Sequence, residues 1–520
     1  MIISLGWLKS FVDFEESPKE LVEILSNIGL EAEIKKDFSK TKNIVVGSIN
    51  GVTKHPNADN LKLCKIDDGN QIFDVVCGAP NLEIGKKVVF AKINSVLPGD
   101  FKINKAKIRG VYSYGMLCSE KELNIGEDND GIMILNDSLN TGDDFTKILK
   151  RKYSSIELDV TPNRPDALNH IGVARDLACF KNTKLKKSKI NVTQPSHIEK
   201  KLFDVIIESV NDCNSYLGGV IRGVKVTKSP DWLVERLRSV GHKSINNIVD
   251  VSNYVMLECG HPTHIFDFDK ISGNEIFVRK AKKHETLETL DQKTHLLNEK
   301  NLVIADKDNP IALAGVMGGF NSGVTNSTTS IFIESAYFNP ITIRKSSKQN
   351  QILTDASRRF ERGVDPEACF DSFNRVVDLI INIAGGKLVT DNHSSCIVKK
   401  QKKFIPFKKK NFEKVIGKKI RINTINKILN NLGFDIIEKN DSLLCKPPSF
   451  RVEIDREIDI IEEVARMIGF NSIKSDENIY GVYNYDSNDE EESLDLLKSY
   501  IVNLGFYQIF SNSFQSRFNT

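Results

Sequence analysis

Apolar residues recur at helical spacing in several stretches of the chain. Between residues 18 and 30 a single apolar stripe follows a candidate N-cap at Ser17 and a proline in the first turn, and Gly29 supplies a stop. This pattern predicts a helix over 18–30. The same spacing predicts further helices over 166–180, 230–240, 366–384, 422–432 and 459–468.

Between about residues 44 and 135 the pattern changes to short β-rich runs separated by Gly, Asn, Asp and Pro. Many short strands with turn signals are typical of a small β-barrel. Strands are predicted here over 44–49, 61–66, 72–77, 87–91 and 132–135. Residues 200–400 are mixed α/β, with strand-like runs over 203–209, 276–279, 301–305 and 330–334. We therefore expect a multidomain α+β protein.

The composition is that of a soluble globular protein. With 520 residues the chain is long enough for about three to four domains. A content of 40% hydrophobic and 27% charged residues excludes disorder over the whole length. No apolar stretch approaches the ~20 residues of a membrane-spanning helix, and the first residues do not resemble a secretory signal. Nine cysteines without a Cys-x-x-Cys pair argue against a disulfide framework or a thiolate zinc site and favour the cytoplasm.

Three strings in the β-rich region, at 55–61, 76–81 and 107–119, carry candidate RNA-binding chemistry. Because the net charge is only +3, nucleic-acid binding would have to come from local basic patches, and composition alone leaves a barrel used for protein contacts open. The order of the strings resembles the tRNA-binding OB fold of synthetase-associated proteins, which implies basic loops for phosphate and an exposed face for RNA. The expected tRNA-binding positions are His55, Asn57, Asp59, Lys107, Arg109 and Ser119.

The mixed region carries polar motifs but no familiar catalytic constellation. The cluster His261, His264, Asp267 and Asp269 has a metal-like composition, yet its run contains proline and no helix that would set an i,i+4 pair, so loop chemistry is the preferred interpretation. The glycine-rich segment 313–319 is too loose for a phosphate loop. Neither a nucleophile elbow nor a Ser/His/Asp triad is evident.

Together these motifs resemble the bacterial phenylalanyl-tRNA synthetase beta subunit family. The resemblance rests on Asn253-Tyr-Val-Met-Leu, His264-x-Phe-Asp, the Ala-Gly-Val-Met-Gly-Gly of 314–319, Glu334 and Thr354-Asp-Ala-Ser-x-Arg-Phe-Glu-Arg-Gly-Val-Asp-Pro, and it covers essentially all 520 residues. It implies a cytoplasmic (αβ)2 heterotetramer that aminoacylates tRNA(Phe). The alpha subunit would bind ATP, phenylalanine and the tRNA 3′ end, so no aminoacylation residue is expected in this chain.

The resemblance also implies an editing site between the modules of 200–400 that hydrolyses tyrosine wrongly esterified to tRNA(Phe). Glu334 matches the residue expected to receive the tyrosine hydroxyl, although taken alone it would be an ordinary strand-end carboxylate. A pocket that hydrogen-bonds a hydroxyl can reject the analogue lacking it by roughly 10⁴–10⁵. The other expected pocket positions are His264, Asn253, Gly315, Thr354, Ala356 and Lys243. The lysine replaces an arginine common in the family and would hold RNA less rigidly.

Carboxylates near the helix predicted at 459–468 form a candidate magnesium site. Asp459, Glu462 and Glu463 follow helical spacing, Glu453 can approach from a preceding strand, and oxygen ligands suit Mg²⁺. An acid at a helix start followed by Glu three residues on is also a capping signature that needs no metal. The resemblance assigns Mg²⁺ to these four positions, although the family usually has Asp in place of Glu453.

The expected organisation follows the same resemblance. It comprises an N-terminal α/β module at 1–38 and 148–195, the OB fold at 39–147, an editing module at 196–400, a winged-helix-like domain at 401–476, and a linker with the start of a class II synthetase-like domain at 477–520. Within it, the basic run 399–421 is either a solvated face or a nucleic-acid contact, and the acidic run 486–495 is expected to be a solvated linker.

Family members run longer than this chain, which therefore resembles a C-terminally truncated beta subunit, and pairing with the alpha subunit is in doubt. The alternative is a non-catalytic tRNA-binding module or an inactive fragment.

Overall fold

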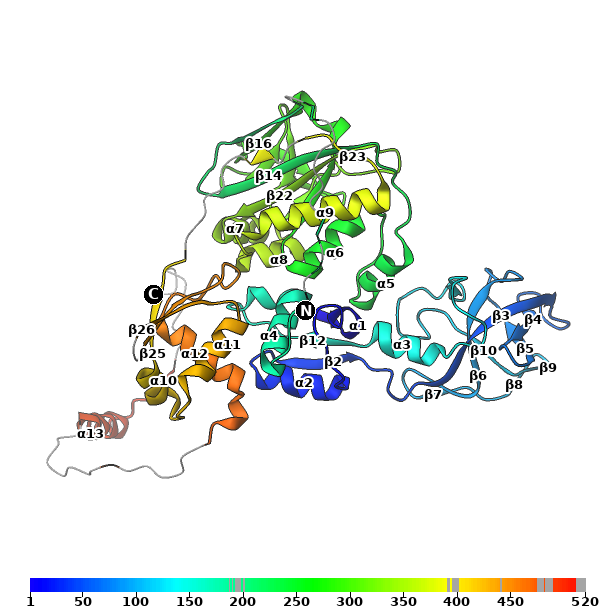
Figure 1. Ribbon diagram of the computed structural model, residues 1–520, viewed down its shortest axis with the longest axis horizontal. Helices are drawn as coiled ribbons and strands as arrows, with labels where there is room; N and C mark the ends of the chain where they lie inside the picture. Colours follow the sequence, from blue (N-terminus) through cyan, green and yellow to red (C-terminus); the bar gives the residue numbers. More distant parts are fainter. Residues whose placement is uncertain are drawn as a thin grey trace. The chain divides into compact units, whose positions relative to one another are not determined.

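The computed structural model (Figure 1) describes residues 1–186, 188, 190–191, 198–199, 202–390, 393–394, 402–439, 442–474, 481 and 490–510. Residues 1–473 form one compact unit and residues 474–520 a second. Parts of the predicted basic run, 399–401, and of the acidic run, 486–489, lie outside the described residues.

The N-terminal module is built on a three-stranded antiparallel sheet of order β1-β12-β2. Its strands are β1 (Ile2–Ser4), β2 (Ala32–Lys36) and β12 (Ser155–Leu158). Its helices are α1 (Leu5–Leu8), α2 (Pro18–Asn27), α3 (Phe145–Tyr153), α4 (His170–Lys181) and the short η1 (Pro165–Ala167). The Ser17 hydroxyl accepts the Glu20 N–H, and the Glu20 carboxylate accepts the Ser17 N–H, so α2 starts with the predicted cap. Gly29 takes a positive φ of 86° just beyond the end of α2.

The β-rich region is a seven-stranded sheet inserted between β2 and α3. The main path runs β10-β6-β3-β4-β5, with β7 and β11 also paired to β6. The Tyr114 N–H donates to the Asp74 carbonyl at 2.9 Å, which brings the start of β10 to β5 at the far end of the path. The strands are β3 (Lys42–Lys54), β4 (Lys62–Asp67), β5 (Ile72–Cys77), β6 (Lys87–Leu97), β7 (Phe101–Lys102), β10 (Gly115–Leu117), β11 (Ile134–Leu135) and the separate hairpin β8 (Ala106–Ile108) and β9 (Val111–Ser113).

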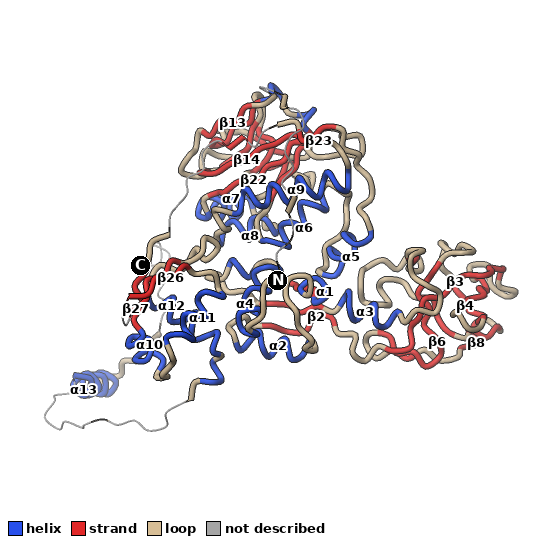
Figure 2. The backbone as a smooth tube through the Cα atoms, viewed as in Figure 1, coloured by secondary structure: helices blue, strands red, loops and turns tan. Residues whose placement is uncertain are grey.

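Two sheets face each other in the mixed region, and Figure 2 shows their strands lying to one side of helices α6 to α9. The first sheet has the order β15-β22-β14-β23 with β24 also paired to β14, and the second has the order β13-β16-β19-β20-β21. The first sheet contains β14 (Cys213–Arg222), β15 (Thr263–Asp267), β22 (Ser330–Phe338), β23 (Lys387–Leu388) and β24 (His393–Ser394). The second contains β13 (Asp204–Ile207), β16 (Glu275–Lys280), β19 (Leu302–Ala305), β20 (Pro310–Leu313) and β21 (Met317–Gly318).

Helices cover the outer face of the β14–β22 sheet, where α6 and α9 pack against it and each other. The helices of this region are α5 (Asp231–Ser239), α6 (Val249–Cys259), α7 (Pro340–Asn350), α8 (Asp355–Arg362), α9 (Ala368–Ala384), η2 (Phe268–Lys270) and η3 (Ser272–Asn274). A small hairpin joins β17 (Thr286–Glu288) to β18 (Thr294–Leu296). An aromatic and aliphatic core lies on the inner face, between the two sheets, and includes Phe203, Phe266 and Phe332.

The last part of the first unit has a three-stranded sheet of order β25-β27-β26 with helices packed on it. Its elements are β25 (Ile405–Lys408), α10 (Lys409–Ile416), α11 (Ile422–Asn431), β26 (Asp435–Lys439), β27 (Ser442–Lys446), α12 (Glu457–Ile468) and η4 (Phe470–Ser472). The second unit contains α13 (Glu490–Asn503), so the acidic run predicted to be a linker is helical from Glu490 onward.

One hydrophobic cluster connects the N-terminal module, the helices of the mixed region and the last sheet. It includes Trp7, Val251, Val376, Leu443 and Ile460. The three parts therefore share one hydrophobic core, in which their side chains pack against one another.

Candidate functional site

Glu334 lies at the centre of the inner sheet face. It stands on β22, and the register places His264 of β15 opposite it on one side and Gly218 of β14 on the other. Its side chain faces the same way as Phe332 and Ala336, toward the core between the two sheets. The residue is only 6% exposed, so the predicted acid is buried as the editing hypothesis requires.

The Glu334 carboxylate has a phenol as its partner. The fully buried Tyr216 of β14 donates its hydroxyl to Oε2 of Glu334 at 2.8 Å. Burial raises the pKa of Glu334 to about 7, and the Tyr216 hydrogen bond opposes part of that rise. This acid therefore changes charge near neutral pH.

His264 lies beside this acid, and its ring packs against a glycine. Its ring meets Phe266 edge-on with the centroids 4.4 Å apart. A Cβ on Gly318 of β21 would lie 2.4 Å from Cε1 of His264, so only glycine leaves room for the imidazole. Burial lowers the pKa of His264 to about 4, and the ring is neutral at physiological pH. A neutral imidazole can donate one hydrogen bond and accept another, which suits the orientation of a water molecule.

Thr354 connects the glycine-rich segment to α8. Its hydroxyl donates to the Val316 carbonyl at 2.8 Å and accepts the Ser357 N–H as the cap of α8. Ala356 lies in the first turn of this helix. Gly315 adopts a φ of 64°, and a Cβ there would press on three core side chains at about 3.0 Å. Gly315, Thr354 and Ala356 are thus brought together with the segment that packs on His264.

Asn253 and Lys243 are the remaining predicted pocket residues. Asn253 is on α6, which is tied to β15 by a hydrogen bond from the Ser252 hydroxyl to the Thr263 carbonyl at 2.7 Å. Lys243 is exposed, and the Nε2 of the adjacent His242 lies 3.4 Å from a carboxylate oxygen of Asp355 in α8. Because α6 packs on the sheet face that carries Ile333, opposite Glu334, the structure does not bring Asn253 to the acid, and no described hydrogen bond joins either residue to Glu334.

Sequence reasoning missed Tyr216 and Gly218, and it gave Gly318 only as part of the glycine-rich motif; together the three residues fix the surroundings of Glu334. It also treated 260–269 as a loop, whereas Thr263–Asp267 is strand β15. The motif glycines were visible in the sequence, but the strand pairing that brings Tyr216 to Glu334 spans 118 residues. No local pattern reports such a pairing.

The four carboxylates predicted to bind Mg²⁺ are not gathered into one group among the described residues. Glu463 is buried, and both of its oxygens accept hydrogen bonds from Arg451 and Arg466. Glu462 is exposed, next to it on the helix but on another face. Within the described residues no group of three or more His, Cys, Asp or Glu side chains could hold a metal. The arginines balance the charge of Glu463 in this arrangement, and the magnesium site at the four positions stays a prediction.

The other two carboxylates also have arginine or backbone partners. Asp459 accepts the backbone N–H groups of Asp455 and Arg456 at 3.1 and 2.8 Å, which is the capping arrangement weighed against a metal. Glu453 accepts a hydrogen bond from Arg451 at 2.7 Å, while its Oε2 is buried without a partner among the described residues.

The predicted RNA-binding residues of the β-rich sheet divide into two groups. His55 and Asn57 hold the 55–61 loop to the β8–β9 hairpin, since the His55 ring lies 3.2 Å from the Ile108 carbonyl and the Asn57 amide donates to Arg109. Ser119 is likewise used internally, because its N–H donates to the Glu122 carboxylate. The remaining three residues, whose side chains are exposed, are Asp59, Lys107 and Arg109.

A basic and aromatic cluster surrounds this hairpin. The Lys105 ammonium lies 4.4 Å from the ring centre of Tyr112 and 4.6 Å from that of Tyr114, and the Lys107 ammonium lies 5.5 Å from that of Tyr112. Tyr112 is 47% exposed. Lysines beside exposed aromatic rings are the chemistry used to hold phosphates and stack bases.

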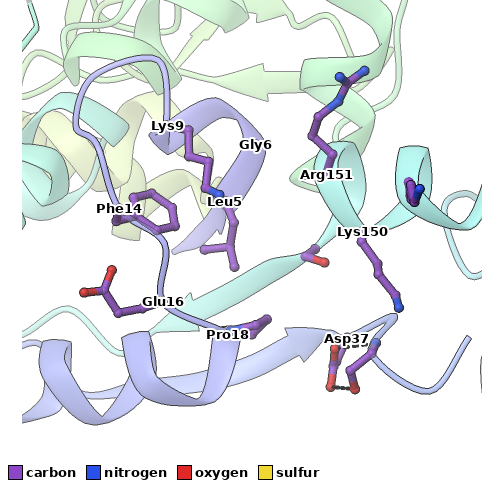
Figure 3. A pocket seen from close by; sticks show the side chains of 12 residues that line it. Leu5, Gly6, Lys9, Phe14, Glu16, Pro18, Asp37, Lys150 and Arg151 are labelled. Atoms are coloured by element: carbon purple, nitrogen blue, oxygen red, sulfur yellow. Dashed lines mark hydrogen bonds between the residues drawn. The ribbon is translucent and has the colours of Figure 1, made fainter.

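A separate cavity of about 340 Å³ lies beside α1 and α3 (Figure 3). Lysines and arginine line it together with Glu16 and Asp37, and in the figure Lys150 points toward Asp37 while Arg151 points away. The Lys9 ammonium lies over the Phe14 ring at 4.9 Å. Its charges are mixed, and it contains none of the predicted site residues.

Comparison with known proteins matches three family models to the chain. The putative tRNA binding domain matches residues 44–144, the B3/4 domain residues 212–385 and the tRNA synthetase B5 domain residues 405–470. These segments correspond to the β-rich sheet, the two facing sheets with their helices, and the last sheet with α10 to α12.

Full-length relatives also match. The phenylalanine–tRNA ligase beta subunit of Fusobacterium nucleatum is 40% identical and covers 100% of this chain and 65% of its own length. Those of Syntrophotalea carbinolica and Geobacter metallireducens are 41% and 38% identical, cover 91% and 99% of this chain, and match over 60% and 65% of their own lengths. The chain thus spans a little under two thirds of these relatives.

Among solved structures, an N-terminal fragment of the phenylalanyl-tRNA synthetase beta-subunit from Pyrococcus horikoshii matches 90% of this chain and 99% of its own, at 13% identity and a TM-score of 0.37. Within the described residues, no helix is both long enough and apolar enough to cross a bilayer.

Proposed function

We propose that the chain is a member of the phenylalanine–tRNA ligase beta subunit family, which binds tRNA(Phe) and hydrolyses tyrosine wrongly attached to it. The observation that carries the editing activity is the buried carboxylate of Glu334, which accepts a phenol hydroxyl from Tyr216 at 2.8 Å. The site therefore has the chemistry needed to accept the hydroxyl of a substrate tyrosine.

Selectivity follows from the placement of this acid. Tyrosine exceeds phenylalanine by one hydroxyl, and an apolar pocket separates two such side chains poorly, whereas a hydrogen-bonding pocket can separate them by roughly 10⁴–10⁵. Phe203, Phe266 and Phe332 surround the inner face and suit an aromatic ring, and Glu334 supplies the polar partner. Phenylalanine would leave this acid without its second partner.

Hydrolysis in this site requires an oriented water and a polarised ester carbonyl. The neutral imidazole of His264, directly opposite Glu334 in the sheet, is placed to position the water. Backbone N–H groups of the glycine-rich segment around Gly315 and a hydroxyl of the tRNA itself can stabilise the developing oxyanion. The water oxygen bonds to the ester carbon, the bond from that carbon to the tRNA 3′-terminal oxygen breaks, and a proton from the water passes to the leaving oxygen, which releases tyrosine and the free tRNA 3′ end.

tRNA binding is proposed for the exposed cluster of Lys105, Lys107, Arg109 and Tyr112 in the β-rich sheet, for which an OB-fold barrel is the expected architecture. The domain over 405–470 is proposed to be winged-helix-like. The assembled enzyme would be an (αβ)2 heterotetramer, in which the alpha subunit uses ATP to attach phenylalanine to tRNA(Phe). Magnesium would act there with ATP, and the predicted ligands at 453–463 are a further place for it to bind.

The test is deacylation by the full chain. Purified protein should hydrolyse Tyr-tRNA(Phe) and spare Phe-tRNA(Phe), and Glu334→Ala should reduce the preference for the tyrosyl substrate. Glu299→Ala, which removes an exposed carboxylate from the same region, is the matched control and should behave as wild type. Salt-sensitive tRNA binding without any deacylation would instead support the non-catalytic binding module.

A further inference from the structure

Tyr216 satisfies one oxygen of the buried acid and leaves the other available. Its hydroxyl donates to Oε2 of Glu334, and in the described part of the chain Oε1 accepts no hydrogen bond. Oε1 is not among the fully buried side-chain atoms that lack a partner, which means that it reaches accessible space. The carboxylate is therefore divided into an occupied oxygen and an open one.

The residues around Glu334 leave Tyr216 as the partner of one carboxylate oxygen and no partner for the other among the described residues. Tyr216 is fully buried, and Gly218, directly opposite Glu334, has no side chain that could bond the carboxylate. A Cβ on Gly218 would lie 2.6 Å from the ring of Phe332, so the strand has no room for a competing group there. On the other side His264 packs on Gly318 and Phe266. The orientation of the carboxylate thus depends on Tyr216.

From this geometry we infer that Tyr216 is a specificity-determining residue, which orients the Glu334 carboxylate so that Oε1 can receive the phenol hydroxyl of a mischarged tyrosine. The inference rests on the editing function proposed above. Two phenols would then share one carboxylate, one from the protein and one from the substrate. Phenylalanine, which has no hydroxyl, makes no use of Oε1.

Charge is the reason that this residue matters. A hydrogen bond from a phenol favours the ionised form of a buried carboxyl, and a protonated carboxyl is a poorer acceptor for a second phenol. Burial raises the pKa of Tyr216 well above its ordinary value, so its hydroxyl remains a donor at all working pH values. The described titratable groups facing Glu334 are Tyr216 and Cys213 on β14 and His264 on β15.

Glu334 is the member of this group that changes charge between pH 6 and 9. Burial keeps the Cys213 thiol protonated by raising its pKa well above the ordinary value, and it lowers the pKa of His264 to about 4. A pH-dependent preference for tyrosine therefore reports on Glu334. Removing the Tyr216 hydroxyl should move the midpoint of this pH dependence upward by about one to two pH units, which is the effect of losing one hydrogen bond to a charged group.

The experiment compares wild type, Tyr216→Phe and Tyr337→Phe as full chains. Tyr337 lies on β22 with its side chain on the opposite face from Glu334 by strand alternation, and its variant loses the same hydroxyl. Deacylation of Tyr-tRNA(Phe) and Phe-tRNA(Phe) is measured from pH 6 to 8.5, with the spontaneous hydrolysis of each ester subtracted. The readout is the ratio of kcat/KM for the two substrates.

For Tyr216→Phe we expect the preference for tyrosine to fall about tenfold at pH 7 and to recover toward the wild-type ratio at the alkaline end. Tyr337→Phe should match wild type at every pH. A Tyr216→Phe ratio that is unchanged, or lowered equally at all pH values, overturns the role of Tyr216 while the editing function stands. If wild type itself shows no preference for the tyrosyl ester, the proposed function fails and the inference fails with it.

Discussion

Replacing Glu463 with glutamine tests whether arginine, rather than a metal, balances the buried carboxylates between the N-terminal module and α12. Arg466 donates to Glu463 at 2.8 Å and to Asp176 of α4 at 2.7 Å, and Arg451 donates to Glu463 at 2.7 Å. Both arginines are nearly inaccessible to solvent. The substitution keeps the shape of the side chain and removes the charge that both guanidinium groups share.

The expected loss of stability is about 3 kcal/mol. Breaking a buried pair by removing one partner costs about 3–5 kcal/mol, because it leaves an uncompensated buried charge. The lower end applies here, since Arg466 keeps Asp176 and Arg451 keeps Glu453 at 2.6 Å. Glu462→Gln is the matched control at the next position, and because this side chain is exposed its effect should stay within about 0.5 kcal/mol.

The assay is urea unfolding of the full chain, with and without millimolar Mg²⁺. Burial alone would raise the pKa of Glu463, but Arg466 and Arg451 hold this pKa well below its ordinary value. Its stabilisation is therefore fully present above the ordinary carboxyl pKa and is lost only as the pH falls toward the folded value. The gap between wild type and Glu463→Gln should be constant from pH 8 to about 5 and narrow in stronger acid.

Two results would refute this reasoning. One is an equal loss of stability in Glu462→Gln and Glu463→Gln, which would mean that both carboxylates bind the same partner. The other is stabilisation of wild type by Mg²⁺ that disappears in Glu463→Gln, which would restore the metal in place of the arginines.

Three further predictions concern the other sites. Gly318→Ala should reduce Tyr-tRNA(Phe) deacylation at least about tenfold, because its Cβ would lie 2.4 Å from the His264 ring, and tRNA binding measured in parallel should not change. Lys107→Ala should weaken tRNA binding and lower the slope of log K against log salt by about one, whereas a role in protein contacts alone would leave the slope unchanged. As the pH rises from 5 to 8, the free energy of unfolding of Glu334→Gln should increase relative to that of wild type. Burial raises the pKa of this acid to about 7, so ionising it in the folded wild type costs up to about 3 kcal/mol. A difference between the two unfolding midpoints that is the same at pH 5 and pH 8 would contradict this.

Local patterns predicted local structure well. The strand predicted at 72–77 coincides with β5, and the helix begun by Ser17 and Pro18 forms as α2, although it ends at Asn27 rather than residue 30. These elements are determined by caps, turn residues and spacing within a few positions. By contrast, β14 was missed, since its paired glycines at 218 and 219 are poor strand formers outside this context. They are tolerated because the rings of Phe332 and Phe373 fill the space above them.

The candidate site was predictable as a set of motifs but not as a chemical arrangement. Resemblance selected Glu334, His264 and Thr354, and the sheet register and the hydrogen bond from Thr354 to Val316 connect their elements. The state of each group was not predictable, because it depends on partners far away in the sequence. Tyr216 reaches Glu334 only through the pairing of β14 with β22.

The two acidic sites differ in the group that balances the charge of the buried carboxylate. Helical spacing correctly placed Asp459, Glu462 and Glu463 on one helix, but spacing does not say which cation neutralises a carboxylate. At Glu463 two arginines supply that charge, and its pKa falls well below the ordinary value. At Glu334 a phenol supplies only a hydrogen bond, so the acid keeps a pKa near neutrality. A carboxylate neutralised by arginines stabilises the fold and has no oxygen left for a ligand. A carboxylate held by a single neutral donor still has an oxygen and a charge to offer, and for this reason the second acid, rather than the first, is suited to recognise a substrate.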